Sequence, residues 1–121
     1  MIGLGIDVCQ VERIEKALQK GEGFLKRYYT DEERKYLNRK NDAQSAAGMY
    51  AAKEAFLKAL GFGLSGGVAL SDIGVAHDER GCPSYALSEK AAAAMAKKGA
   101  QASYLSISHD AGVAAAVCVL E

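Results

Sequence analysis

The chain has 121 residues, of which 50% are apolar and 25% are charged, and this composition is typical of one compact globular domain. Its 15 lysines and arginines balance 15 aspartates and glutamates, so no overall charge attracts nucleic acid or an anionic membrane. Three scattered cysteines, Cys9, Cys82 and Cys118, lack the paired spacing of a zinc or redox site, which fits a reducing cytoplasm. An acid at Asp7 interrupts the amino terminus, and no stretch reaches the ~18 apolar residues of a membrane span. We therefore expect a single cytoplasmic domain over residues 1–121.

Charge is unevenly distributed along this neutral chain. Residues 10–40 hold nine lysines and arginines against six aspartates and glutamates, whereas the rest of the chain is slightly acidic. A basic face of this kind can guide an acidic partner protein by electrostatic attraction. The other interpretation is an ordinary solvated helix face, and the charge pattern alone leaves both open.

The amino-terminal residues predict a strand followed by a short helix. Residues 2–6 are an apolar run that predicts a buried strand ending near Asp7, and its two glycines allow another backbone to come close. From residue 11 to residue 18 apolar side chains recur at helical spacing, and Gly21 follows where the helix should end.

Two further helices are predicted before the middle of the chain. Thr30 and Glu33 have the spacing of a capping box, which predicts a short helix through about Arg39. The strongest helical pattern covers residues 43–60, where alanines and larger apolar residues share a face and Gly61 can cap the end.

The second half of the chain alternates strands with one more helix. The glycine-rich residues 61–67 predict a mobile connector. Next come a hairpin of strands at 73–76 and 84–87, an alanine-rich helix capped by Ser88, and two strands at 104–108 and 113–120. The fold class expected from these elements is α+β, with a mainly antiparallel sheet packed against one long and several short helices.

Glu54 and Lys58 are the first candidates for chemistry. Their i, i+4 spacing places them on one face of the long predicted helix, where an ordinary solvated ion pair is one interpretation. Their neighbours are small or apolar, however, so part of this face is expected to lie against other protein. A partly buried carboxylate needs a partner, either a lysine or a metal ion.

Asp7, at the end of the predicted first strand, is the second candidate. It can cap the following helix, or it can converge with Glu54. Two carboxylates with open positions suit Mg²⁺, which commonly completes its shell with water and substrate phosphates. Lys58, one turn from Glu54, would then compensate phosphate charge, and the arrangement predicts phosphoryl-type chemistry.

His109 follows the predicted strand at residues 104–108. A single histidine at a strand end is usually structural, but Ser106 and Ser108 add donors that can hold a phosphate. The glycine-rich residues 61–67 lack the lysine followed by serine or threonine of a Walker loop, so they give only a weak phosphate-binding signal.

Three ordered segments resemble the holo-[acyl-carrier-protein] synthase family, the short type of 4′-phosphopantetheinyl transferase. They are GIDVCQVERI at 5–14, GMYAAKEAFLKAL at 48–60 and LSISHDAGVAAAV at 105–117, and together with length and order they extend the resemblance over the whole chain. The resemblance implies transfer of 4′-phosphopantetheine from coenzyme A to a serine of apo acyl carrier protein, with release of adenosine 3′,5′-bisphosphate.

The resemblance also implies roles for particular residues. Asp7 and Glu54 match the Mg²⁺ ligands, and Glu54 and Lys58 are the implied catalytic residues. Coenzyme A would be bound by Lys58, Ser108 and His109. The base for the acceptor serine is either Glu54 or a water on the metal, and the residue types leave this choice open.

Other matched positions concern the carrier protein and the long helix. Arg13, Lys20 and Arg27 match positions that meet an acidic carrier protein in such enzymes. Lys53 either orients Glu54 or packs. Met49 stands where many relatives carry a basic residue, so one contact to a coenzyme A phosphate is expected to be missing or supplied elsewhere.

Members that resemble this chain are homotrimers with active sites between protomers, and we expect the same assembly. Two other hypotheses remain open at this point. One is a coenzyme A or nucleotide binding module without turnover, and the other is a purely structural oligomer, for which Asp7 and Glu54 would point apart.

Overall fold

The computed structural model describes residues 1–61 and 67–121. Its elements are β1 (Gly3–Gln10), α1 (Val11–Gln19), α2 (Gly23–Tyr28), α3 (Asp31–Lys40), α4 (Ala43–Leu60), a 3-10 turn (Leu70–Asp72), β2 (Ile73–His77), β3 (Pro83–Leu87), α5 (Glu89–Lys97), β4 (Ser103–Asp110) and β5 (Val113–Leu120). Of the mobile connector predicted at residues 61–67, residues 62–66 lie outside the described residues.

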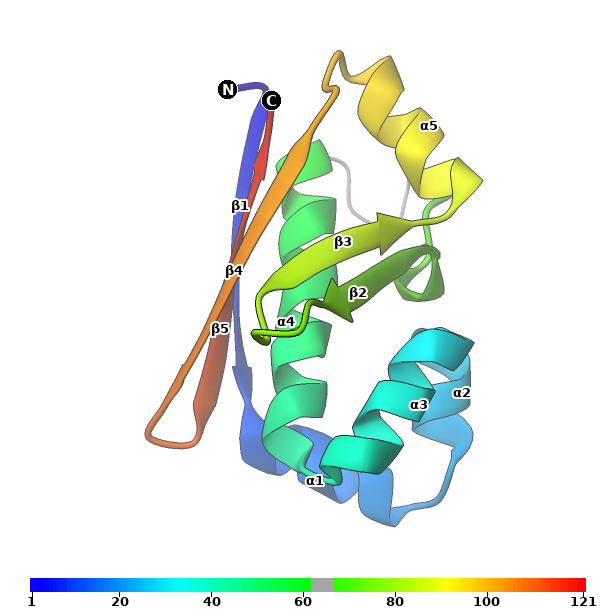
Figure 1. Ribbon diagram of the computed structural model, residues 1–121, viewed down its shortest axis with the longest axis vertical. Coiled ribbons are helices and arrows are strands. Elements are labelled where there is room, and N and C mark those ends of the chain that lie inside the picture. The colour runs from blue at the N-terminus through cyan, green and yellow to red at the C-terminus, as the bar shows by residue number, and fades with distance from the viewer. Residues whose placement is uncertain (62–66) are drawn as a thin grey trace.

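Helix α4 runs through the centre of the molecule (Figure 1). One of its sides is covered by an antiparallel sheet with the strand order β1-β5-β4, and the hairpin β2–β3 lies on another side. Helices α1, α2 and α3 gather at the end where α4 begins, and α5 lies near its other end. This mixture of helices and antiparallel strands confirms the predicted α+β class.

Local signals correctly predicted where the helices begin and end. In α3 the Thr30 hydroxyl accepts from the Glu33 N–H at 3.1 Å, and the Glu33 carboxylate accepts from the Thr30 N–H at 2.8 Å, which completes the capping box. Helix α4 spans Ala43–Leu60 as predicted and ends at Gly61, whose φ of 91° favours glycine.

Three predictions were incomplete. Strand β1 continues past Asp7 to Gln10 because β5 pairs with it over that whole length, and Gln10 rather than Asp7 precedes α1. Strand β4 likewise extends to Asp110, so His109 lies within the strand instead of after it. Helix α2 was not predicted, because it is only six residues long and no side chain caps its start.

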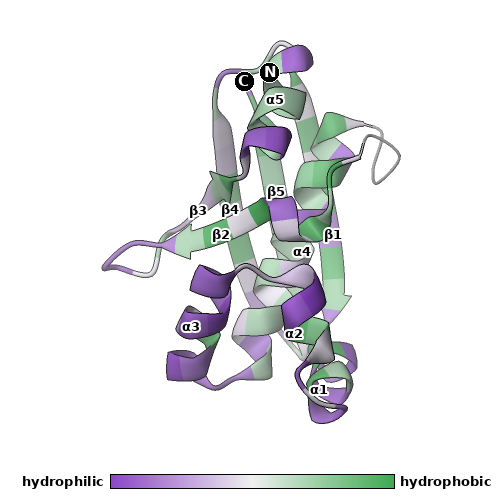
Figure 2. Cartoon of the chain, turned by 90° about the vertical axis from the view of Figure 1, so that its right-hand side faces the viewer, coloured by the Kyte–Doolittle hydropathy of each residue, from purple (hydrophilic) through white to green (hydrophobic). Residues whose placement is uncertain are grey.

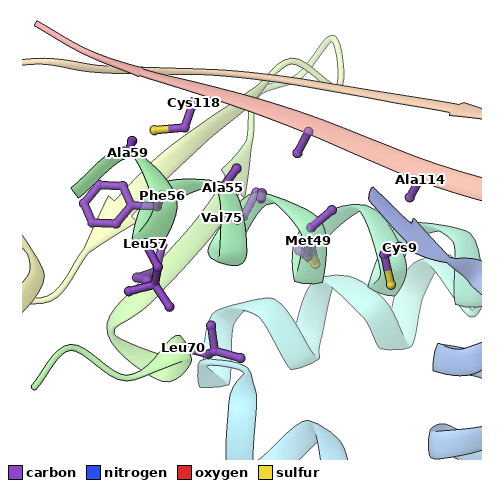
Figure 3. Close-up of a cluster of buried hydrophobic side chains, with 14 of the residues drawn as sticks. Cys9, Met49, Ala55, Phe56, Leu57, Ala59, Leu70, Val75, Ala114 and Cys118 are labelled. Carbon is purple, nitrogen blue, oxygen red and sulfur yellow. The ribbon is translucent and has the colours of Figure 1, made fainter. Parts of the chain in front are cut away.

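The core lies between α4 and the two layers that cover it. Figure 3 shows Cys9, Met49, Phe56 and Cys118 among the buried side chains of this cluster. Figure 2 shows that hydrophilic residues concentrate on α1 and α3, whereas α4 and the sheet are mostly hydrophobic. No helix in the described ranges is long and apolar enough to cross a membrane.

Candidate active site

Asp7 is positioned by the close packing of β1 on α4. Side chains alternate along the strand, and Gly5, Asp7 and Cys9 belong to the face turned toward the helix. A Cβ atom on Gly5 would clash with the carbonyl oxygen of Ala55, so this glycine allows the strand to lie directly on the helix backbone. Asp7, two residues further along, is thereby held beside α4 with only 17% of its side chain exposed.

Lys58 reaches Asp7 from the last turn of α4. The Lys58 Nζ lies 3.1 Å from the Asp7 Oδ1, although the two residues are 51 positions apart. The lysine side chain is 56% exposed, so its ammonium group also faces solvent and remains accessible to an anionic ligand.

Glu54 lies one turn before Lys58 and is half-buried. Burial raises the pKa of its carboxyl group, and the negative charge of Asp7 raises it further, whereas Lys58 and the nearby Tyr50 side chain lower it. Because Glu54 precedes Lys58 by one helical turn and Lys58 contacts Asp7, the three residues lie in one site. The structure therefore brings together the three residues that the sequence predicted, and Asp7 and Glu54 do not point apart.

This carboxylate pair fits a divalent cation bound mainly by substrate and water. The described part of the chain has no cluster of three or more His, Cys, Asp or Glu side chains suited to a metal. Two carboxylates are nevertheless the hard oxygen ligands that Mg²⁺ uses when phosphates and water supply the remaining positions. Asp7 and Glu54 are the residues of this chain that would hold it.

An aromatic cluster of Phe24, Tyr28 and Tyr50 borders the acidic pair. The ring centroid of Phe24 lies 5.2 Å from that of Tyr28 and 5.8 Å from that of Tyr50. Burial and the charge of Glu54 raise the pKa of Tyr50, while Arg13 lowers it. Arg27 lies over the Tyr28 ring at 5.5 Å. Two of the predicted carrier-binding residues, Arg13 and Arg27, therefore flank this cluster.

The third predicted carrier-binding residue is Lys20, which directly follows α1. It borders a small surface cavity with Gly23 and Phe24. Its side chain therefore lies near the Phe24 edge of the aromatic cluster and is exposed.

His109 lies on a different side of the chain from the acidic pair. It is on β4, at the opposite edge of the sheet from β1, and its Nε2 lies 3.1 Å from the Gln44 carbonyl oxygen at the start of α4. A Cβ atom on Gly48 would be 2.9 Å from the same nitrogen, so Gly48 makes room for the imidazole. Ser108, adjacent on the strand, belongs to the other face of the sheet. One chain therefore does not bring Ser108 and His109 together.

A cavity of about 210 Å³ adjoins His109. Lys40 and Ser45 line it from the end of α3 and the first turn of α4, and His77 lines it from β2. These side chains supply cationic and hydroxyl donors, which suit an anionic group.

Lys53 packs away from Glu54. Its Nζ lies 2.6 Å from the Glu33 Oε1 and donates to the carbonyl oxygens of Leu70 and Ile73 at 3.2 and 2.8 Å. Both members of this ion pair are buried. Of the two predicted roles for Lys53, the structure supports packing.

Met49 is 1% exposed and belongs to the core. Its side chain is not part of the Asp7–Glu54 site, and it is not among the residues that line the cavity beside His109. The lack of a basic side chain at this position therefore gives no support to a binding module without turnover.

Sequence reasoning missed one residue of the site, Tyr50. The sequence spacing could have identified Tyr50, because it precedes Glu54 by four residues and i, i+4 neighbours meet on a helix. The apolar pattern of the helix instead suggested a residue of the core.

Comparison with known proteins identifies the class of this fold and site. The chain matches the 4′-phosphopantetheinyl transferase superfamily over residues 3–118. It is 42% identical to the holo-[acyl-carrier-protein] synthase of Geobacter sp. strain M21, covering 98% of this chain and 97% of that protein. It is 44% identical to the corresponding protein of Treponema denticola, covering 100% and 98%.

Solved structures agree with this result. The Helicobacter pylori holo-[acyl-carrier-protein] synthase in complex with coenzyme A superimposes with a TM-score of 0.85 at 34% identity, covering 98% of this chain and 99% of that one. The Neisseria meningitidis synthase gives a TM-score of 0.91 at 31% identity, with coverage of 100% and 98%. The chain belongs to the holo-[acyl-carrier-protein] synthase family of transferases, which confirms the resemblance found in the sequence.

Proposed function

We propose that this chain, acting as one catalytic domain over residues 1–121 in the cytoplasm, transfers 4′-phosphopantetheine from coenzyme A to a serine of apo acyl carrier protein. Adenosine 3′,5′-bisphosphate is the second product. The observation that carries the proposal is the convergence of Asp7, Glu54 and Lys58 in a member of this family.

The acidic pair acts together with Mg²⁺ in this proposal. When bound, the cation stabilises negative charge on the phosphate that leaves with adenosine bisphosphate. Asp7 and Glu54 would hold it where β1 packs against α4. Lys58 adds a positive charge from the exposed side and stabilises the same phosphate oxygens.

Glu54 is one of two candidates for the proton acceptor from the serine hydroxyl of the carrier, the other being a water on the cation. The position of Glu54 beside Tyr50 places it next to the aromatic cluster and the basic residues that flank it, where the carrier protein is expected to approach.

The carrier binds across α1 and α2. Arg13, Lys20 and Arg27 are exposed there, and residues 10–40 carry the excess of basic side chains. An acidic carrier is drawn to this face by its charge, so its apparent affinity should weaken as ionic strength rises.

Coenzyme A is bound between protomers of a homotrimer. Lys58 lies beside β1 and His109 lies on β4, at opposite edges of the sheet, so neighbouring copies can together supply both residues and Ser108 to one ligand. The cavity beside His109 suits one of its phosphates. The outer face of the sheet supports the assembly, because Leu4, Ile6 and Val8 are each more than half exposed in a single chain.

Mass spectrometry tests the transfer directly. Purified protein, coenzyme A, Mg²⁺ and apo carrier protein should give a carrier heavier by one phosphopantetheine arm. Chelation by EDTA should stop the reaction. Coenzyme A binding with no mass gain under any divalent metal would instead identify a binding module.

A further inference from the structure

A cavity of about 500 Å³ lies between α1, the start of α2, the end of α3 and the start of α4, at the end of the molecule where these helices gather (Figure 1). The apolar part of its wall consists of Leu18, Leu25, Leu37, Ala43 and Ala46. A volume of this size is typical of cavities that hold small-molecule ligands. Among the residues that the structure describes, none of those assigned to the cation, coenzyme A or the carrier lines it, so the proposed function does not account for this cavity.

The charged part of the wall is entirely acidic. Glu15 comes from α1, Glu22 directly precedes α2 and Asp42 directly precedes α4, and all three are exposed. Asp42 accepts from the Ser45 N–H at 2.6 Å, which holds its carboxylate at the rim. The other polar side chains that line the cavity are the neutral amides of Gln19, Asn38 and Asn41. Within residues 1–61 and 67–121 no lysine, arginine or histidine lines it.

The contacts of the two glutamates leave them able to bind an external cation. Lys16 follows Glu15 along α1 but is paired with Glu12 at 3.0 Å. Glu22 lies 3.4 Å from Lys26, and these side chains are 84% and 67% exposed. An exposed pair of this kind contributes little, so Glu22 can exchange it for the ammonium group of a ligand.

We propose that this cavity is a binding site for an aliphatic polyamine, a ligand in which methylene chains join several ammonium groups. The ammonium groups pair with Glu15, Glu22 and Asp42, and the methylene chains pack against the apolar wall. A metal ion would match only the charge and leave the apolar wall in water. The inference goes beyond the proposed function and does not depend on it, because Glu15 and Arg13 are two positions apart on α1 and therefore face different sides.

Isothermal titration calorimetry of the full chain with spermidine, at constant ionic strength, tests the proposal. Mg²⁺ is present throughout, because it competes with spermidine for the acidic pair of the candidate active site. Glu15→Gln removes one carboxylate of the rim, and Ala43→Met fills part of the cavity without a change of charge. Glu12→Gln is the matched control, since it removes the same charge from the same helix and Glu12 does not line the cavity. The Tm of each variant shows whether it is folded.

We expect one spermidine per chain. The Kd should rise about two- to fivefold in Glu15→Gln, as for the loss of an exposed ion pair, and binding should be lost in Ala43→Met. Glu12→Gln should bind as the wild type does. Equal weakening in Glu15→Gln and Glu12→Gln would overturn the proposal, because it would indicate only diffuse attraction by charge. Undiminished binding in folded Ala43→Met would place the ligand elsewhere and also overturn it. So would the absence of spermidine binding at millimolar concentration, even if a lysine-rich peptide bound instead.

Discussion

Glu54 is a residue whose charged form the folded chain disfavours. It is half-buried, it faces the negative charge of Asp7, and Lys58 is paired with that aspartate. A carboxylate in such surroundings lowers the stability of the metal-free protein. Groups with perturbed pKa values of this kind are typical of functional sites, where the ligand compensates the charge.

Glu54→Gln should therefore raise the Tm of the metal-free protein at neutral pH. The folded-state pKa of Glu54 is raised, so the folded chain keeps a proton over a pH range in which the unfolded chain has lost it. Stability from this group consequently falls as pH rises from the ordinary carboxylate range, about pH 4, to the raised value.

Thermal unfolding in EDTA, followed by circular dichroism from acidic to neutral pH, measures the effect. The difference between variant and wild type should shrink toward acidic pH. Added Mg²⁺ should stabilise the wild type only. A variant less stable than wild type at neutral pH would contradict this account, and Glu12→Gln on the surface of α1 is the control.

At the scale of elements, the pair Lys53–Glu33 ties three segments together. Lys53 on α4 donates to Glu33 on α3 and to the carbonyl oxygen of Ile73, where β2 begins. Glu33 in turn accepts from the N–H of Val75 on β2 at 2.9 Å. The pair is fully satisfied and buried, so each partner depends on the other.

Lys53→Met should destabilise the fold by about 3–5 kcal/mol, because it leaves the Glu33 carboxylate buried without its partner. Denaturant unfolding measures this loss, and the double variant with Glu33→Gln should recover part of it. The folded fraction should still transfer phosphopantetheine, since Lys53 faces away from Glu54. Loss of transfer in a fully folded variant would instead give Lys53 a role in the reaction.

The contact between β1 and α4 offers a second test at this scale. Gly5→Ala places a Cβ atom against the Ala55 carbonyl oxygen, so β1 must shift and carry Asp7 away from Glu54. We expect a loss of about 1–3 kcal/mol, as for other overpacked positions, together with weaker Mg²⁺-dependent transfer. Gly23→Ala is the control, because its Cβ atom meets nothing within 4 Å. Equal effects of the two substitutions would refute the explanation.

The sequence predicted the elements that local signals define and missed those that distant partners define. The capping box at Thr30 and the left-handed Gly61 determine helix ends within a few residues of chain, so α3 and α4 were predicted well. The length of β1 depends on pairing with β5, more than 100 positions away at Gly3 and Leu120. Local signals could not supply that information.

The residues of the site divide in the same way, into those that local sequence signals predict and those that depend on distant contacts. The i, i+4 relation of Glu54 to Lys58 was visible in the sequence. The approach of Asp7 to them was predicted only as a hypothesis and by resemblance, because it depends on β1 crossing α4. Tyr50 was overlooked because an aromatic residue in an apolar helix resembles a core position.

At the scale of the molecule, the outer face of the sheet β1-β5-β4 exposes apolar side chains that a single chain does not cover. Its exposed apolar side chains include Leu4, Ile6 and Val8 on β1 and Tyr104 on β4. A face of this kind is costly in water and is typical of a protein interface. The proposed trimer would bury it.

Ile6→Asp should break that assembly while leaving the single chain folded, since Ile6 is 61% exposed. Light scattering after size exclusion should show monomers, and transfer should be lost because Lys58 and His109 no longer meet across protomers. Lys90→Asp on α5 adds negative charge elsewhere and should change neither property. An active monomer would contradict a shared site.

The central position of α4 also determines which parts of the molecule can unfold locally. With 12 of its 18 residues buried between two layers, α4 can lose its backbone hydrogen bonds only when the whole fold unfolds, so its amide protons should exchange most slowly. Helix α2, with no buried residue, can open locally. Glu54 thus lies on the more protected of these two helices, and the proposed carrier site includes the one that can open locally.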